Sequence, residues 1–351
     1  MKSSLFTFTL IFLFCSVSFS QKNNKVTSNT SEKLNSATFS GMKFRNIGPA
    51  FTSGRVADIA VNSKNPFEYY IAVASGGVWK TNNSGNTYVP IFDNENSYSI
   101  GCIALSPSNE NIIWIGTGEN NNQRSVAYGD GVYKSEDGGK TFKNMGLKKS
   151  EHIGKIIIHP KNDKIVYVAA YGPLWSAGGE RGVYKTIDGG NTWTKVLSIS
   201  ENTGISDLIM DPRNPEIVYA AAHQRRRHVW TYIDGGLESA IHKSDDGGTT
   251  WKKLSNGLPS GQIGRIGLAI SPVDPDYVYA IIKASGTTGG FYRSKDRGAS
   301  WAKMSNYQTS GNYYQEIVCD PHDKHKIFSM NTWLHHSEDG GKTFKKTGEK
   351  I

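Results

Sequence analysis

Residues 135–142 read SEDGGKTF, and this eight-residue phrase decides the fold because it occurs six times in the chain. The other copies are residues 81–88 (TNNSGNTY), 186–193 (TIDGGNTW), 244–251 (SDDGGTTW), 294–301 (SKDRGASW) and 337–344 (SEDGGKTF). Their second glycines follow one another at intervals of 43 to 58 residues. A repeat of this length indicates stacked supersecondary units, each too small to bury its apolar face alone.

Each unit also contains a short apolar run, rich in β-branched residues and usually closed by proline. The clearest copies are residues 100–107 (IGCIALSP), 153–160 (IGKIIIHP), 205–212 (ISDLIMDP) and 314–321 (YQEIVCDP), and residues 56–63 and 265–272 are looser ones. These runs predict a buried first strand. An Asn or Asp turn, a second apolar-aromatic strand and a third strand follow, and the fourth strand begins at the aromatic residue of the phrase. Four short antiparallel strands in each unit predict an all-β chain folded as a β-propeller.

The phrase has a local physical explanation. Its hydroxyl and its carboxylate can accept hydrogen bonds from turn amides, its glycine supplies a positive φ, and its aromatic ring can pack between neighbouring sheets. We therefore expect a structural role for the third residue of each copy, which is Asn83, Asp137, Asp188, Asp246, Asp296 or Asp339. The first copy departs from the pattern at Asn83 and Ser84, and the fifth at Arg297. One or two carboxylates in each turn are too few for a calcium site.

This phrase is similar to the Asp box of bacterial neuraminidase repeats. From about residue 42 to its end, the chain resembles the repeat propellers of the sortilin N-terminal domain and, more distantly, sialidases and xyloglucan-cleaving hydrolases. The resemblance implies the blade type but no single activity, because binding proteins and hydrolases both carry the phrase. Sialidases have a Phe-Arg-Ile-Pro phrase near the start, whereas residues 44–49 read FRNIGP. We therefore transfer no catalytic residue, and we interpret Arg45 as a surface residue of a strand.

The N-terminal segment differs from the repeats. Residues 1–20 have a charged start, a short apolar stretch and small residues near the end, which predicts a secretory signal peptide. Residues 21–41 are polar and predict a flexible linker, and residues 42–351 form the propeller. We expect an exported protein (periplasmic, cell-surface or secreted) that does not insert into a membrane after the signal is removed.

Residues 42–48 (MKFRNIG) resemble the fourth-strand segment 141–146 (TFKNMG). The chain thus shows six blades and an extra N-terminal strand, which indicates part of a larger propeller of seven or more blades, incomplete at its C-terminus. Further blades of a longer chain would then be partners of this segment. Two alternatives stay open: a six-bladed ring with a redundant edge strand, or closure through a partner chain.

Charge and cysteine content exclude several function classes. The formal net charge of +9 comes from Lys and Arg scattered through the repeats, which indicates a solvated basic surface and argues against a nucleic-acid partner.

After signal removal only Cys102 and Cys319 remain, and we interpret them as buried free thiols. The alternative, a disulfide, would need the second and sixth units to touch. No spacing indicates a metal site or a cofactor, and the adjacent His335 and His336 point to opposite faces of a strand.

Propeller topology places the turn phrases on one face and the longest insertions on the other. These insertions are residues 118–130, 172–181 and 223–239. We call the face that carries them the rim; it also includes the connections between successive blades. Loops on a rigid scaffold concentrate binding residues, and the candidate ligand-binding residues here are Arg55, Glu119, Arg124, Trp175, Arg181, Arg225, Arg226, Arg227, His228 and Trp230. The run 225–228 is either a solvated basic loop or a site for a carboxylate or another anion.

The sequence favours an exported interaction module of the sortilin-like type that binds a peptide, protein or glycan at the rim. The alternative is a glycoside hydrolase, which needs two carboxylates about 5 to 9 Å apart in one cleft. The rim carboxylates Glu119, Glu151, Glu180 and Glu201 are candidates, but their spacing singles out no pair, so catalytic residues are unassigned. A purely structural role is the third possibility. A raised carboxylate pKa in a cleft would favour the hydrolase.

Overall fold

The computed structural model describes residues 34–42 and 54–348. The described residues belong to two units, one that contains residues 34–42 and one that contains residues 54–348. In the first unit, the short 3-10 helix η1 (Ser36–Phe39) is capped by Asn35, whose side chain accepts hydrogen bonds from the backbone N–H groups of Ala37 and Thr38. The predicted signal peptide, most of the linker and nearly all of the extra N-terminal strand lie outside the described residues, so those predictions stay predictions.

The second unit consists of six four-stranded antiparallel sheets, numbered here as blades 1 to 6 in chain order. Blade 1 contains β1 (Val56–Val61), β2 (Tyr69–Val73), β3 (Gly77–Thr81) and β4 (Val89–Pro90). Blade 2 contains β5 (Ile100–Leu105), β6 (Ile113–Thr117), β7 (Val132–Ser135) and β8 (Lys143–Asn144). Blade 3 follows the short 3-10 helix η2 (Lys148–Ser150) and contains β9 (Ile153–Ile158), β10 (Val166–Ala170), β11 (Gly182–Thr186) and β12 (Thr194–Leu197).

The last three blades repeat this order. Blade 4 contains β13 (Thr203–Met210), β14 (Val218–Arg227), β16 (Ala240–Ser244) and β17 (Lys252–Lys253), with β15 (Tyr232–Asp234) added beside the end of β14. Blade 5 contains β18 (Ile263–Ile270), β19 (Val278–Ala284), β20 (Gly290–Ser294) and β21 (Ala302–Ser305). Blade 6 contains β22 (Ile317–Cys319), β23 (Ile327–Ser329), β24 (His335–Ser337) and β25 (Lys345–Lys346).

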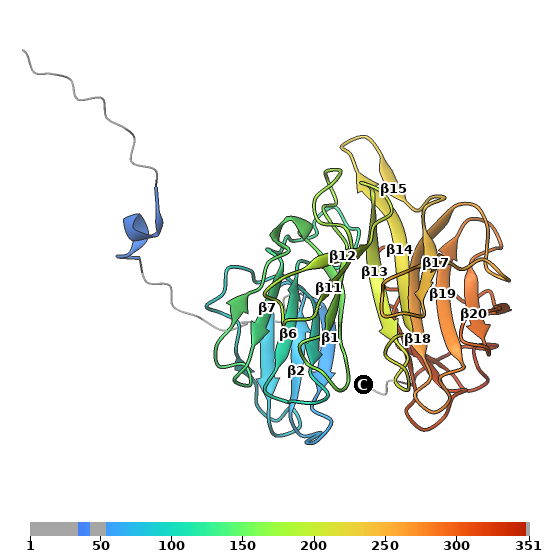
Figure 1. Cartoon of the computed structure of the whole chain (residues 1–351), viewed down its shortest axis with the longest axis horizontal. Coiled ribbons are helices and arrows are strands. Elements are labelled where there is room, and N and C mark those ends of the chain that lie inside the picture. The colour runs from blue at the N-terminus through green and yellow to red at the C-terminus, as the bar shows by residue number, and fades with distance from the viewer. Residues whose placement is uncertain (1–33, 43–53, 349–351) are drawn as a thin grey trace, which may run out of the picture. The chain divides into compact units, whose positions relative to one another are not determined.

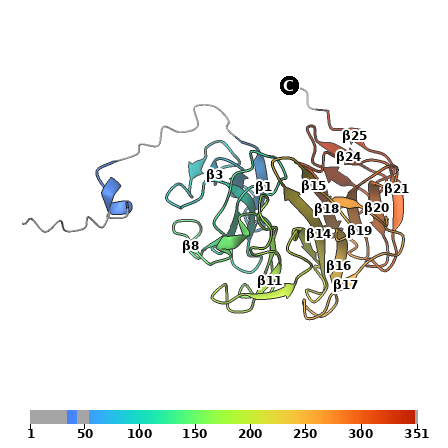
Figure 2. The ribbon, with the colours of Figure 1, turned by 90° about the horizontal axis from the view of Figure 1, so that it is seen from above.

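The blades are arranged around a common axis, as the view from above shows (Figure 2). Strands within each blade pair in sequence order, because short turns connect antiparallel neighbours. The first strands of blades 1 to 5 are six to eight residues long, and β22 of blade 6 has three residues. Together these six strands lie nearest the axis. The prediction of an all-β propeller with six four-stranded antiparallel blades is therefore confirmed.

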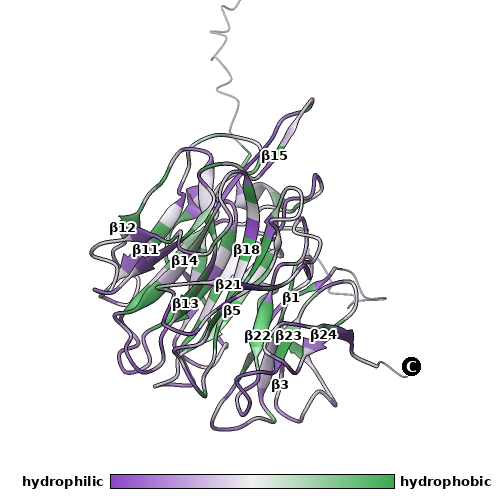
Figure 3. Cartoon of the chain, turned by 90° about the vertical axis from the view of Figure 1, so that its right-hand side faces the viewer, coloured by the Kyte–Doolittle hydropathy of each residue, from purple (hydrophilic) through white to green (hydrophobic). Residues whose placement is uncertain are grey.

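The hydrophobic core lies between neighbouring sheets. Hydrophobic residues are concentrated in the strands, β22 among them, while the connections are mostly hydrophilic or neutral (Figure 3). One core cluster joins Trp114 of blade 2 to Ile156 and Val168 of blade 3. The aromatic residue of the blade 3 turn phrase, Trp193, packs edge-to-face on Trp114 with ring centroids 5.9 Å apart and donates its indole N–H to the Met145 carbonyl. The phrase thus fills the space between two sheets, as its pattern predicted.

The hydrogen bonds of the phrase repeat in every blade. In blade 2, the Ser135 hydroxyl accepts from Gly139 N–H at 2.9 Å and donates to Asp137 Oδ1 at 2.8 Å. Asp137 also accepts from the backbone N–H and the hydroxyl of Thr141, at 2.9 and 2.6 Å. Asn83 keeps the backbone bond in blade 1, where Thr87 N–H donates to Asn83 Oδ1 at 3.0 Å, but its amide donates to the Thr87 hydroxyl. The six turns therefore share one geometry despite the irregular first copy.

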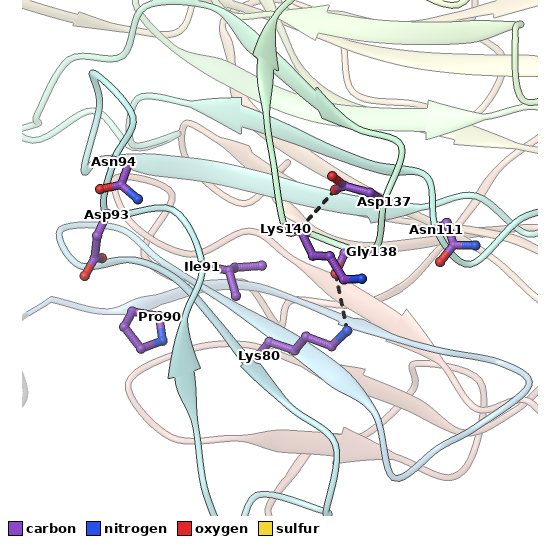
Figure 4. Close-up of a pocket in the computed structure, with 10 residues that line it drawn as sticks. Lys80, Pro90, Ile91, Asp93, Asn94, Asn111, Asp137, Gly138 and Lys140 are labelled. Atoms are coloured by element: carbon purple, nitrogen blue, oxygen red, sulfur yellow. Dashed lines mark hydrogen bonds between the residues drawn. The ribbon is translucent and has the colours of Figure 1, made fainter.

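Basic residues next to the phrase connect blades 1, 2, 3 and 5 to the blade that follows each of them. The Lys80 ammonium donates to the Gly138 carbonyl at 3.3 Å, across a surface hollow between blades 1 and 2 that Asp93, Asn111 and Lys140 also line (Figure 4). Equivalent contacts join Lys134 to Gly189 O, Lys185 to Gly247 O and Arg293 to Gly340 O. Part of the excess positive charge therefore serves inter-blade packing.

Two further sequence-based predictions concern the thiols and the membrane. Cys102 and Cys319 are both buried and unpaired, which confirms the free-thiol interpretation. Burial raises the pKa of Cys319 to about 12 and raises that of Cys102 as well, so both stay protonated at neutral pH. Within residues 34–42 and 54–348, no helix has the length and apolar character needed to cross a membrane.

Candidate functional site

A cavity of about 810 Å³ lies where the first strands of the blades converge. All six blades contribute to its wall, among them Asp58 of β1, Lys155 of β9, Asp207 of β13 and Arg265 of β18. Apolar side chains line much of the remainder: Ile59, Ile209, Met210, Leu268, Ile270, Val318 and Met330. A mostly apolar cavity with a few converging charged groups is the usual form of a ligand site. We call this space the channel.

Backbone irregularity directs charged residues into the channel. In blades 1 to 4, the pairing of the first two strands shifts register at the second residue of the first-strand motif, as a β-bulge does. The residue that follows each shift is Asp58, Cys102, Lys155 or Asp207. At Gly101, one of the shift positions, a Cβ atom would lie 2.2 Å from the Ile153 carbonyl oxygen of the next blade. Glycine is therefore required there for the blades to approach each other.

The channel carries a belt of charge at this level, formed by Asp58, Lys155, Asp207, Arg265 and Glu316, and we call it the charged belt. The Lys155 ammonium lies 3.2 Å from Asp58 Oδ2. Arg265 is buried, donates to the Tyr313 carbonyl at 3.3 Å and has its other terminal nitrogen 3.8 Å from Glu316 Oε1. Three carboxylates thus share the channel with two cations.

The belt perturbs the pKa values of its members. Burial raises the pKa of Asp207 to about 6, and the charge of Glu316 adds to that rise while Lys155 opposes it. Burial also raises the pKa of Glu316, against the opposing effects of Arg265 and Lys155. The charge of Asp58 raises the pKa of Lys155, so this ammonium stays charged at neutral pH.

Above the belt, residues of three blades meet at the rim. Arg55 directly precedes β1 of blade 1 and forms an ion pair with the buried Glu119 of blade 2 at 2.9 Å. Its guanidinium also lies 4.6 Å from the centre of the Tyr313 ring of blade 6. Ser75 and Asn121 donate further hydrogen bonds to the Glu119 carboxylate, at 3.3 and 3.1 Å. Two of the predicted site residues, Arg55 and Glu119, are therefore brought together at the channel wall.

The basic run forms part of a hairpin. Residues Arg225, Arg226 and Arg227 end β14, which pairs with β15 in a hairpin that extends beyond the neighbouring loops (Figure 1). Arg225 is fully buried and donates to Asn121 O and Gly172 O, each at 2.8 Å. Its guanidinium stacks 3.5 Å from the centre of the Tyr171 ring. Arg225 therefore ties the insertions of blades 2 and 3 to blade 4.

The neighbouring arginines also have partners within the protein. Arg227 is buried, donates to the Asn122 carbonyl at 2.8 Å and stacks on Tyr232. Arg226 points to the other face of the strand, where it donates to Asn202 Oδ1 at 2.9 Å. Neither interpretation of the run, a solvated basic loop or an anion site, anticipated these contacts with backbone carbonyls. A direct ligand role for Arg225 and Arg227 stays a prediction.

Arg181 is likewise buried and donates to the carbonyl groups of Tyr171, Pro173, Ser176 and Gly178. Burial lowers its pKa to about 9. The accessible members of the predicted set are Arg124 and Trp230, which are exposed, and Trp175 and His228, which are half-buried. Trp230 is 82% exposed and stacks on His228 with ring centroids 5.3 Å apart.

The rim carboxylates do not assemble as a pair. Glu119 is bound to Arg55, and Glu180 accepts a hydrogen bond from Lys149 N–H at 2.8 Å. Glu151 has φ of 61° and a pKa raised by burial, against the opposing charges of Arg181 and Arg225. Two other carboxylates with raised pKa values, Asp207 and Glu316, both line the channel. Sequence reasoning missed them, although a charged residue inside an apolar run was a usable signal.

The described residues contain no group of three or more His, Cys, Asp or Glu side chains placed to hold a metal ion. The buried polar network near the rim instead links protein groups to one another. Tyr171 hydrogen-bonds to His223, whose other ring nitrogen lies 3.3 Å from Asp234 Oδ1. Asn122 also donates to Asp234 at 2.8 Å, and Lys283 contacts its other oxygen. This network stabilises the rim loops.

Comparison with known proteins places the chain among repeat propellers. Residues 130–257 match the family model described as Sortilin-Vps10, sortilin, neurotensin receptor 3. The resemblance to sortilin-type propellers is confirmed. The matched segment runs from the end of the blade 2 insertion to the fourth strand of blade 4, and so includes the buried arginines of the rim.

Xyloglucanases are also similar to this chain. A xyloglucanase from a Paenibacillus species is 23% identical over 344 residues, which are 87% of this chain and 32% of that protein. The solved GH74 xyloglucanase from Xanthomonas campestris superimposes with a TM-score of 0.61 and 14% identity, covering 85% of this chain and 46% of the other. The chain spans only 29 to 40% of the length of the curated relatives it matches.

A smaller solved propeller has a similar fold. The structure described as YCF48 bound to D1 peptide superimposes with a TM-score of 0.54 and 14% identity, covering 84% of this chain and 82% of the other. At this identity the likeness shows a shared fold.

Proposed function

We propose that this chain is an exported binding module that holds a peptide segment of its ligand at the rim and the channel mouth. The observation that carries the proposal is the interlocked rim, in which Arg225 joins two insertions above a cavity of about 810 Å³. Loops fixed by buried hydrogen bonds present a preformed surface, which lowers the entropic cost of binding. The sortilin-type match and the similar propeller described with a bound peptide support a peptide over other ligand classes.

The accessible aromatic residues of the rim provide the test. A peptide array and a glycan array should be probed with the wild type and with the Trp230→Ala variant. We expect peptide retention by the wild type and a loss of about tenfold in affinity in the variant, because exposed tryptophans often dominate binding energy. Phe67→Ala is the matched control, since Phe67 is an exposed aromatic residue in the turn between β1 and β2, on the opposite face. Retention that is insensitive to Trp230→Ala, or no retention at all, would contradict the proposal.

A second candidate function is glycoside hydrolysis. It is favoured by the similarity to xyloglucanases and by two channel carboxylates, Asp207 and Glu316, whose pKa values are raised. A protonated carboxyl group could serve as the general acid and an ionised one as the base. Release of reducing ends from xyloglucan, abolished by Asp207→Asn, would establish this function in place of the first. The same arrays separate the two, because a hydrolase releases product and a binding module retains its ligand.

A further inference from the structure

The charged belt contains two related pairs of positions, each two blades apart. The third residues of the first-strand motifs are Asp58 in blade 1 and Lys155 in blade 3, and Asp207 in blade 4 and Glu316 in blade 6. The first pair combines a carboxylate with an ammonium group at 3.2 Å. The second pair combines two carboxylates. The second pair therefore lacks the positive charge of the first pair, and negative charge is in excess at these positions of the channel.

Asp58 and Asp207 are held in the same way. Asp58 accepts hydrogen bonds from the backbone N–H groups of Ile59 and of Ile103 in the next blade. Asp207 accepts the equivalent bonds from Leu208 and from Leu268 in the next blade. Lys155 completes the surroundings of Asp58. Among the described side chains, no Lys, Arg or His lies within 4.0 Å of the Asp207 carboxylate. The position that an ammonium group occupies beside Asp58 has no equivalent protein cation beside Asp207.

The belt cations do not remove this imbalance. Lys155 is committed to Asp58, although it also interacts at longer range with Asp207 and Glu316. Arg265 lies 3.8 Å from Glu316, which is too long for a hydrogen bond. The channel wall near the two carboxylates includes the apolar residues Ile209, Met210 and Val318. It also includes the Asn120 amide, which lies 3.5 Å from Glu316 Oε1 and carries no charge. A ligand group suited to this place has a positive head and an aliphatic stem.

We infer that the channel binds an alkylammonium group, whose charge lies beside Asp207 and Glu316 and whose carbon chain contacts Ile209, Met210 and Val318. A lysine side chain of a peptide has this chemistry, and so does a free aliphatic amine. The inference rests on the proposed function, since it names the ligand group that the rim would admit to the channel. Ion pairing in a partly dehydrated cavity supplies selectivity, and the apolar wall supplies the contact area.

The first experiment uses n-hexylammonium as the probe, with hexanol and hexanoate as uncharged and anionic analogues of equal chain length. Binding to the full protein is measured by titration calorimetry and by ligand-observed NMR. We expect hexylammonium to bind about tenfold or more tightly than hexanol, because a hydrogen bond to a charged group contributes that much. Asp207→Asn and Glu316→Gln should each remove this preference. Asp245→Asn, which alters an exposed carboxylate in the turn phrase of the same blade, should leave it unchanged.

The affinity should also depend on pH. Asp207 must be ionised to attract the ammonium, so binding should strengthen as pH rises from 5 to 7, through its pKa of about 6. The other titratable or charged groups facing it are Asp58, Lys155, Arg265 and Glu316. Equal binding of hexanol, tighter binding of hexanoate, or an unchanged preference in Asp207→Asn would each overturn the inference.

A second experiment separates a peptide lysine from a free amine. Peptides retained on the array are compared with versions that carry Nε-acetyl-lysine, which keeps the stem and removes the charge. If acetylation weakens peptide binding to the wild type but not to Asp207→Asn, the group bound in the channel is a lysine side chain of the peptide. Peptide binding that ignores both acetylation and Asp207→Asn would refute the channel inference and leave the proposed function standing. Hexylammonium binding without any peptide retention would refute the proposed function and leave the channel chemistry standing.

Discussion

Arg225 holds three rim segments together through one buried guanidinium. It donates to Asn121 O, Asn122 Oδ1 and Gly172 O and stacks on Tyr171. Arg225→Ala would leave these buried acceptors without a donor, so we expect unfolding to require about 3 kcal/mol less. Arg225→Lys should recover only part of the loss, because an ammonium group cannot reproduce the planar fork. Urea unfolding followed by tryptophan fluorescence measures both.

The control for this prediction is Arg124→Ala, since Arg124 belongs to the same rim but is exposed. It should change stability by no more than about 0.5 kcal/mol. An Arg225→Ala protein that unfolds at the wild-type urea concentration would show that the arginine is not needed to hold the insertions.

The turn aspartates make the fold sensitive to acid. Hydrogen bonds from Thr250 lower the pKa of Asp246 to about 2, and the corresponding bonds lower the pKa of Asp137 and Asp188. A lowered pKa in the folded state means that the unfolded chain binds more protons, so stability is present above pH 4 and is lost as pH falls toward 2. Replacing all five turn aspartates by Asn should reduce the proton uptake on unfolding by up to one per residue. Thermal unfolding between pH 5 and 2 measures this slope.

Asn83 is the natural reference for that experiment, because it already makes the turn with an amide. Asn83→Asp should introduce one additional acid-sensitive turn, so its melting temperature should fall more steeply with decreasing pH than that of the wild type. If the melting temperatures of the wild type, the variant with five turn aspartates replaced and Asn83→Asp fall equally with pH, the turn carboxylates do not determine acid stability.

At the scale of the structural element, the turn phrase contains two strained positions. Ser84 and Arg297 have φ of 59° and 55°, where the other four copies have glycine with φ between 64° and 74°. Side chains other than glycine are disfavoured in this region by about 1 kcal/mol. Ser84→Gly and Arg297→Gly should therefore each raise stability by up to about 1 kcal/mol, measured by urea unfolding. Gly138→Ser, the reverse change in blade 2, should lower stability by a similar amount; an increase would contradict the strain argument.

Short-range patterns were sufficient to predict the elements themselves. The Ser-x-Asp-x-Gly turn specifies its own hydrogen bonds, so residues 135–142 indicate a tight turn without reference to the rest of the chain. The sequence placed the run 225–228 in an insertion, so it did not predict that β14 continues to Arg227, with Arg225 and Arg227 on one face and Arg226 on the other. Sequence alone could not show that carbonyl groups of loops 118–130 and 172–181 would accept their hydrogen bonds, because those contacts join residues more than 50 positions apart.

The charged belt was hidden for a related reason. Simple alternation assigns residues by odd and even position, but the register shift at the second residue changes which face the following residue occupies. Lys155 and Asp207 therefore point into the channel from runs that otherwise indicate buried strands. Their mutual arrangement depends on the ring as a whole, which brings the first strands of different blades together.

At the scale of the whole molecule, the first strands of the first and last blades each carry exposed apolar residues. The fourth residue of the first-strand motif is buried in blades 2 to 6, where it is Ile103, Ile156, Leu208, Leu268 or Ile317. In blade 1 the same position, Ile59, is 52% exposed, and its neighbour Val61 is equally exposed. On blade 6, Val318 is 53% exposed. Ile59, Val61 and Val318 are thus accessible apolar residues on these two sheets, and Ile59 and Val318 also line the channel.

Such residues favour association with another apolar surface. We therefore expect the chain to self-associate with increasing concentration, and we expect the combined change Ile59→Thr, Val61→Thr and Val318→Thr to weaken association about tenfold, because it removes apolar area while keeping β-branched residues in the strands. Sedimentation velocity over a concentration series measures the effect. Ile187→Thr is the control, since Ile187 is also exposed but stands alone in the turn phrase of blade 3. Equal association of the triple variant and the control would assign self-association to another surface. A strictly monomeric wild type would mean instead that these residues are covered within one molecule.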